Sequence, residues 1–393
     1  MSEYQYYEFA AIDQPLTAQQ QAELRSRSSR AMISSGSFIN EYHWGDLKGD
    51  PLDWMQRYFD AHVYSANWGC CRLMLRLPRA ALEAAELAPF IAPATADSGF
   101  GQLFSAVETA EHWILDWDFN DDSGEYERFW TGDDGPGWMG RLLPLRDELL
   151  RGDPRPLYLG WLARVNRGEF DDSDLEPPLP AGLASLTAAQ QALAEFLLID
   201  PDWLCAAATD SPALAAQGPE DADFELWLQE QTEADLRARV RLLLEGRALE
   251  AERSVRRAYL AWQQPRQATS ASPERRRLAE IEARVMTVRA QRLENERLAN
   301  EAKAAKLRAE YSAMLNRLVQ EAPQVWQEID STVERGTGGA YEKAFQLLQM
   351  LAEAMKRAGQ EADFRHGLVR LLERHGHRPA WMKRLQRAGL AHP

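Results

Sequence analysis

The chain has 393 residues, 45% of them hydrophobic and 27% charged, and it carries a formal net charge of −15. This composition supports two or three globular domains with buried cores and excludes a disordered or fibrous protein. No apolar run approaches the roughly 20 residues of a membrane span, and the start of the chain lacks the basic and apolar parts of a secretory signal. We therefore expect a cytoplasmic protein without a membrane partner.

The charge is divided unevenly along the chain. Residues 1–250 carry a net charge of −24, whereas residues 251–393 carry a net charge of +9. Phosphates are repelled by an acidic surface, so nucleic acid is not expected to bind the first region. The two regions therefore face different partners, or they face each other.

The first region predicts an acidic α+β domain over residues 1–168, with a mixed or antiparallel sheet and helices. Thr17 and Gln20 have the spacing of a capping box, which predicts a helix through about Arg25, and Pro51 marks the start of a second helix. Further helices are predicted at residues 138–150 and 157–165. Strands are predicted at residues 4–12, 38–44, 63–68, 72–77, 112–120 and 126–131.

The strand at residues 112–120 alternates between apolar and polar side chains. One face carries Trp113, Leu115, Trp117 and Phe119, and the other carries Asp116 and Asp118. After a turn, the returning strand adds Glu125 and Glu127. These four carboxylates form a candidate site for a hard cation, and the alternative is a solvated polar face opposite the core.

The second half of the chain predicts mostly helices. An acidic, proline-containing stretch at residues 169–185 has the composition of a linker, and helices follow over residues 186–264. Residues 274–320 contain no Gly or Pro and predict one long charged helix. Its apolar spacing begins as a coiled-coil heptad at Leu278, Ile281, Val285 and Val288, but the following positions are polar or small. A free-standing homodimeric coiled coil is therefore not favoured over a helical arm.

The last part of the chain, residues 323–393, predicts a basic bundle of short helices. Its end is rich in arginine and lysine, with Trp381 available for stacking. The candidate phosphate-binding or internally docking side chains are Arg378, Lys383, Arg384 and Arg387. Either role is consistent with the charge, because a basic strip can bind phosphates or the acidic first half of the same chain.

Other groups were weighed as sites. Cys70, Cys71 and Cys205 with His43 or His62 as a base would be required for nucleophilic catalysis, but no local motif marks a nucleophile. The histidines His366, His375 and His377 lie close in sequence without a metal-binding motif. Trp44 and Trp68 each precede a glycine, and exposed indoles of this kind anchor protein partners, whereas buried ones belong to a core.

Several segments together resemble a family of uncharacterised bacterial proteins that combine an N-terminal α+β region with a C-terminal long helix and helical bundle. The segments are the tyrosine-rich residues 2–9, residues 40–51, residues 174–183, the long charged helix and residues 378–385. The resemblance implies no activity and no site residues. It implies that the two halves of the chain belong together.

The sequence favours a non-enzymatic interaction or scaffold protein in which a helical arm joins two globular ends. Its expected partner is another protein, no cofactor is expected, and the oligomeric state stays open. One alternative is a metal-dependent hydrolase or nuclease that uses the acidic hairpin. A second alternative is a nucleic-acid-associated protein that uses the basic C-terminal helices.

Overall fold

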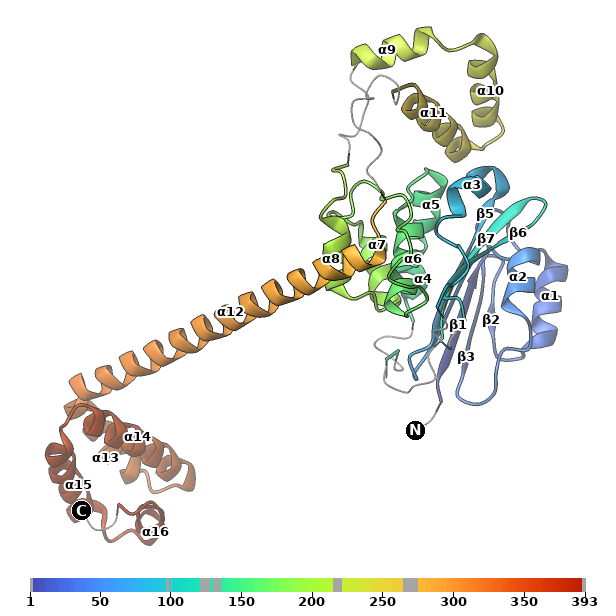
Figure 1. The fold of residues 1–393 in the computed structure, drawn as a ribbon. Coiled ribbons are helices and arrows are strands. Elements are labelled where there is room, and N and C mark those ends of the chain that lie inside the picture. Colours follow the sequence, from blue (N-terminus) through green and yellow to red (C-terminus); the bar gives the residue numbers. More distant parts are fainter. Residues whose placement is uncertain are drawn as a thin grey trace. The chain divides into compact units, whose positions relative to one another are not determined.

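The computed structural model describes residues 3–96, 99, 101–120, 128–129, 136–214, 221–263 and 275–390. The chain divides into two compact units, Met1–Ala290 and Gln291–Pro393 (Figure 1). Each unit has a hydrophobic core of its own. Within the described residues, none of the helices combines the length and the apolar character that a membrane span requires.

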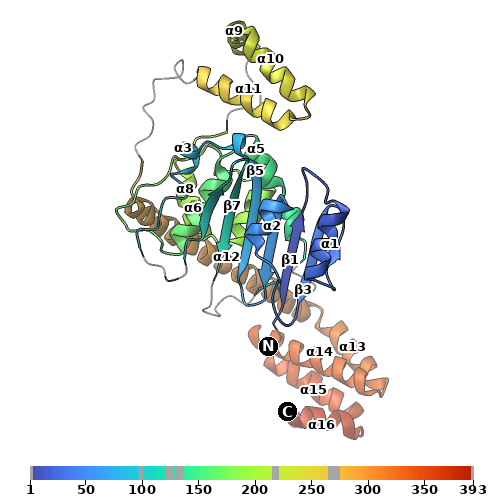
Figure 2. The ribbon, with the colours of Figure 1, turned by 90° about the vertical axis from the view of Figure 1, so that its right-hand side faces the viewer.

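Unit 1 is built on a seven-stranded antiparallel sheet, which confirms the α+β prediction (Figure 2). The strand order is β2-β3-β1-β4-β5-β7-β6. The two edge strands β2 and β6 were not predicted, because both are short. The strands are β1 (Gln5–Ala10), β2 (Met32–Ile33), β3 (Ser37–Tyr42), β4 (Ala61–Ala66), β5 (Cys71–Pro78), β6 (Phe104–Glu108) and β7 (His112–Phe119).

One face of the sheet is covered by α1 (Ala18–Arg27) and α2 (Pro51–Arg57) (Figure 2). The predicted capping box is confirmed, since Thr17 and Gln20 bond to each other's backbone amides at the start of α1. The carboxylate of Asp50 caps α2 by accepting a hydrogen bond of 3.0 Å from the amide of Leu52. The core under these two helices is aromatic, with Phe9, Phe38 and Trp54 packed ring against ring.

The other face of the sheet packs on helices from the middle of unit 1. The helices are α4 (Trp138–Leu142), α5 (Pro144–Leu150), α6 (Arg155–Asn166), α7 (Ala188–Phe196) and α8 (Pro201–Ala208). The short η1 (Arg79–Ala81) and α3 (Ala84–Leu87) follow β5 in the chain. The predicted apolar face of β7 is buried in this core. Gly160 of α6 allows the close approach, because a Cβ there would lie 2.5 Å from Nε1 of Trp117.

The acidic segment predicted as a linker contributes two buried carboxylates to unit 1. Glu169 accepts a hydrogen bond of 2.7 Å from Nε of Arg164, and both side chains are almost completely buried. Glu176 accepts two hydrogen bonds from Arg276, of 2.7 and 2.6 Å, and one from the hydroxyl of Tyr158. These bonds hold the residues just before the long helix to the acidic segment at residues 169–185.

Three further helices complete the described part of unit 1. They are α9 (Asp221–Gln229), α10 (Glu233–Leu244) and α11 (Ala248–Gln263). Helices were predicted over residues 186–264 without these boundaries. The breaks fall where Thr232 caps α10 and where Gly246 takes a φ of 76°.

The long helix α12 (Leu278–Gln320) is confirmed, and it has three parts. Its first turns bury Leu278, Ile281 and Val285 in the core of unit 1. Near its other end, Leu318 and Val319 pack against the core of unit 2. From residue 290 to residue 314 every side chain is exposed except that of Ala304, which is half-buried.

Unit 2 closes with a small helical bundle, as predicted. Its helices are α13 (Ala322–Glu334), α14 (Gly338–Arg357), α15 (Glu361–His375) and α16 (Pro379–Arg387). Apolar stripes from all four meet around Trp381 and Leu385, which are completely buried. Thr337 caps α14, and Gly336, with a φ of 68°, marks the turn from α13.

The buried His62 predicts a pH dependence of stability. Its ring stacks on Phe9 at 3.9 Å between centroids, and its Nδ1 lies 3.0 Å from the carbonyl oxygen of Glu8. Burial lowers the pKa of His62 from 6.5 to about 3. Since the folded state favours the neutral ring, the stability that it contributes is complete above pH 6.5 and decreases as the pH falls towards 3, by at most about 1.4 kcal/mol per pH unit.

Replacing this histidine tests the effect. In His62→Phe the ring no longer takes up a proton on unfolding, so the free energy of unfolding should decrease less between pH 6.5 and pH 4 than in the wild type. Urea denaturation at a series of pH values measures the difference. Parallel curves for the two proteins would contradict the assignment.

Candidate functional site

The predicted acidic hairpin is not seen, because β7 pairs with β5 and β6, and Asp116 and Asp118 of β7 face an arginine. Most of the predicted return strand at residues 126–131 lies outside the described residues. Arg72 of β5 reaches Asp116 of β7 with two hydrogen bonds, of 2.9 and 2.6 Å, and lies 3.8 Å from Asp118. Burial raises the pKa of Asp118, while Arg72 acts in the opposite direction. Glu125 and Glu127 lie outside the described residues. A metal ion could bind Asp116 only by displacing Arg72. The alternative function as a metal-dependent hydrolase or nuclease stays a prediction.

The two predicted tryptophans differ in exposure. Trp44, which follows β3, is 81% exposed, and among the described residues only Leu244 is a comparably exposed large apolar side chain. Trp68 is half-buried in the turn between β4 and β5, and its backbone forms an isolated bridge to Arg128. Of the two, Trp44 alone presents most of its ring to solvent.

The turn that carries Trp44 is fixed from beneath. The buried Gln5 donates from Nε2 to the carbonyl oxygen of Gly45 at 3.1 Å and to Oδ1 of Asp46 at 2.8 Å. The hydroxyls of Tyr7 and Tyr64 donate to the other end of the same amide, at 2.9 and 3.2 Å. This network assigns the orientation of the Gln5 amide and holds the turn in one conformation.

The glycine after Trp44 has a structural reason. Gly45 adopts a φ of 78°, and nothing lies within 4 Å of the Cβ that another residue would add. The constraint is therefore the left-handed backbone and not a lack of space. Before the turn, His43 lies against Tyr4, with 5.5 Å between ring centroids. The exposed indole thus projects from an ordered turn.

The predicted basic strip belongs to the bundle of unit 2. Arg378 donates to the carbonyl oxygen of Val333 at 3.2 Å and to the hydroxyl of Tyr341 at 3.3 Å. Arg384 lies over the ring of Tyr341 and 3.5 Å from Glu342. Two of the four cations therefore bind within the unit. Lys383 and Arg387 are exposed on α16, and phosphate binding or docking by this strip stays a prediction.

The cysteines are placed as core thiols or at the surface. Cys70 and Cys71 are buried, and Cys205 is exposed. Burial raises the pKa of Cys71 to about 12, although Arg128 lies 3.2 Å from its sulfur. Because the thiolate is the nucleophile, this cysteine is inert at neutral pH. His62, the buried base candidate, bonds to the backbone of Glu8 instead.

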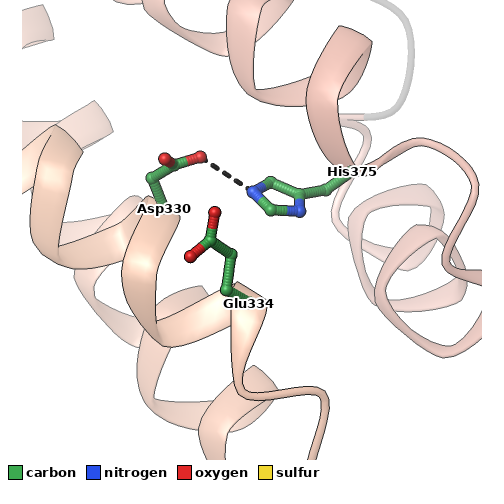
Figure 3. Close-up of side chains that lie close together, drawn as sticks. All are labelled: Asp330, Glu334 and His375. Carbon is green, nitrogen blue, oxygen red and sulfur yellow. Dashed lines mark hydrogen bonds and ion pairs between the residues drawn. The ribbon is translucent and has the colours of Figure 1, made fainter.

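One cluster in unit 2 has the donor types of a metal site, and the sequence analysis singled out only one of its members. Asp330 and Glu334 lie one turn apart on α13, and His375 ends α15 (Figure 3). One atom from each lies within 4.8 Å of the others. Two carboxylates and an imidazole are donors that suit a divalent transition metal.

The contacts of this cluster join two helices of unit 2 to each other. Nε2 of the buried His375 lies 2.8 Å from Oδ1 of Asp330 (Figure 3). The other oxygen of Asp330 accepts a hydrogen bond from Arg374. These bonds fasten the end of α15 to α13, and a cation would compete with Arg374 for Asp330. His366 and His377 are exposed and take no part in the cluster.

A hollow of about 380 Å³ opens between α1 and α2. Its lining side chains pair with each other: the hydroxyl of Tyr58 donates to Glu23 at 2.6 Å, and Arg57 lies 3.3 Å from Glu23 and 3.4 Å from Asp53. Acidic and basic side chains both line the hollow, so it does not favour a ligand of one charge sign.

No known family model matches the chain, and no curated protein or solved structure matches it significantly. No activity and no site residue is therefore carried over from a relative. Among the groups described above, the turn of Trp44 combines a highly exposed apolar side chain with an ordered backbone.

Proposed function

We propose that the protein is a non-enzymatic interaction protein, and that unit 1 binds a protein partner through the indole of Trp44. The supporting observation is an 81% exposed tryptophan on a turn that the buried Gln5 holds in place. Exposure of a large aromatic ring to water is unfavourable, so its burial by a partner lowers the free energy. Tryptophans are among the residues that dominate the free energy of protein association.

The order of the turn adds to this argument. A side chain on a mobile loop loses conformational freedom when it is bound, and this opposes binding. The bonds from Gln5 to Gly45 and Asp46 restrict the turn before any partner arrives. The acidic groups of the same region, Glu41 and Asp46, favour a partner whose contact surface is apolar at its centre and basic at its rim.

The scaffold part of the proposal rests on α12. Its ends lie in two separate cores, and its exposed middle connects two folded units in one chain. Such a chain can hold a partner at each unit, and when both units contact one partner the second contact forms at high effective concentration. The nucleic-acid alternative would use the exposed Lys383 and Arg387 of unit 2.

We expect Trp44→Ala to weaken partner binding strongly and to leave folding unchanged. Loss of an anchoring tryptophan typically costs about 2 kcal/mol or more of binding free energy, or roughly thirtyfold in affinity. Full-length wild-type and variant proteins should be compared for recovery of the same bound protein from cell extract, and for thermal melting.

The matched control is Met32→Ala, because Met32 is also apolar and 66% exposed in unit 1. Its recovery of the partner should equal that of the wild type. Equal recovery by the Trp44 variant, or an equal loss in both variants, would remove the support for Trp44 as the anchor.

A further inference from the structure

The long helix α12 carries a regular stripe of side chains that is separate from the seam of Leu278, Ile281 and Val285. Two sets of residues, each spaced by seven, lie alternately four and three residues apart and therefore share one face of the helix. The first set is Met286, Leu293, Asn300, Leu307 and Met314. The second set is Ala290, Arg297, Ala304, Tyr311 and Leu318.

The central part of the stripe is largely uncovered and combines leucines with small and polar side chains, whereas Leu318 at its end packs against the core of unit 2. Leu293 is 53% exposed and Leu307 is 58% exposed. The earlier seam of Leu278, Ile281 and Val285 is used inside the core of unit 1, so it does not compete for this face. The seam continues only in polar or small residues, whereas the stripe has Leu293 and Leu307 two heptads apart on one face of the helix.

We propose that the stripe binds the same stripe of a second copy of the chain, as an antiparallel coiled coil of two α12 helices. This self-association is a property beyond the proposed partner binding at Trp44, and it does not depend on that proposal. With Arg297 of one copy opposite Asn300 of the other, the two sets meet between Met286 and Tyr311.

In this register the side chains fit by size. Ala290 faces Leu307 of the second copy, and Leu293 faces its Ala304. By the two-fold symmetry each of these layers occurs twice, so every leucine of the central stripe meets an alanine. Large side chains opposite small ones interdigitate and let the helices approach closely.

The charges beside the stripe select the antiparallel direction. Glu296 of one copy then lies next to Lys303 of the other, and this attractive pair also occurs twice. In a parallel pair the same positions would place Glu296 beside Glu301 and Lys303 beside Arg308. Both of those contacts are repulsive.

The central arginine layer is compatible with burial only because it is already paired. Arg297 donates to Glu294 at 2.9 and 2.7 Å and to Glu301 at 2.5 Å along its own helix. In the antiparallel register Glu294 lies near Glu301 of the second copy, and the two arginines between them offset that repulsion. A parallel pair would instead bring Arg297 against Arg297.

The test is the mass of the full-length protein in solution, measured by sedimentation equilibrium across the micromolar range. We expect the wild type to be a dimer and Leu293→Glu/Leu307→Glu to be a monomer, because four buried carboxylates would face alanines. Both positions are exposed within each copy, so circular dichroism should show unchanged helix content. The matched control is Leu298→Glu, since Leu298 is 50% exposed but lies off the stripe.

Disulfide cross-linking tests the direction. In a Cys205→Ser background, Glu296→Cys/Lys303→Cys should form an oxidised dimer, whereas Ala304→Cys alone should not, because its partner position lies further along the helix. A monomeric wild type, a dimer that survives the double glutamate substitution, dissociation by Leu298→Glu, or cross-linking only through Ala304→Cys would overturn the proposal.

Discussion

Arg164→Met should lower the free energy of unfolding by about 3–5 kcal/mol, because it leaves the buried Glu169 carboxylate without its partner. Arg164 is completely buried, and Glu169 is almost so. The arginine also donates to the carbonyl oxygen of Phe90 at 3.1 Å, so a second buried acceptor loses its bond. Chemical denaturation of the full-length protein measures the loss.

The control for this prediction removes the stranded charge. In Arg164→Met/Glu169→Gln the glutamine can still accept the 2.7 Å hydrogen bond from the amide of Leu103, and much of the stability should return. An exposed ion pair gives the scale: Arg57→Met, which breaks the surface pair with Glu23, should cost about 0–1 kcal/mol. Equal losses in the Arg57 and Arg164 variants would contradict the buried-pair explanation.

The second large effect is expected in the core of unit 2. Trp381 is completely buried, and the apolar stripes of α13, α14 and α15 meet around it. Trp381→Ala removes the ring and leaves a cavity, so we expect a loss of about 3–5 kcal/mol in the stability of this unit. Hydrogen–deuterium exchange should show the lost protection in residues 322–390.

Because unit 1 has separate cores, the protection of its sheet should not change in this variant. Val369→Ala is the control within unit 2, since Val369 is 38% exposed on α15 and its loss leaves little cavity. If Trp381→Ala lowered the protection of β1–β7 as much as that of unit 2, the two cores would not be independent.

Regular patterns in the sequence predicted the fold well. The alternation of residues 112–120 placed Trp113, Leu115, Trp117 and Phe119 in the core of unit 1, and the capping box of Thr17 and Gln20 placed the start of α1. These features depend on neighbours within a few residues. The predicted helix across residues 138–150 instead divides at Pro144, because α4 ends at Leu142 and α5 begins there.

Long-range pairing is what the sequence could not reveal. The acidic composition of residues 169–185 is typical of a linker, yet Glu176 binds Arg276, which is one hundred residues away. In the same way, Asp330 and His375 come from different helices of unit 2. Asp116 was predicted as a cation ligand because no residue near it in the sequence indicates that Arg72 is its partner.

The stripe on α12 was missed for a different reason. The first apolar residues of the helix, Leu278 to Val288, follow one heptad phase, and this phase continues in polar or small residues. Those first residues belong to the core of unit 1, as the structure shows. A second phase, offset around the helix and containing Leu293 and Leu307, becomes visible only when the first has been assigned.

The proposal that the protein acts by binding another protein at Trp44 is tested most directly by cross-linking in the cells that make it. A photoreactive phenylalanine analogue at position 44 should join one distinct protein to the full-length chain, and the same analogue at position 32 should not. Both positions are exposed in unit 1, at 81% and 66%. Identical cross-linking patterns at the two positions, or none at position 44, would contradict the account.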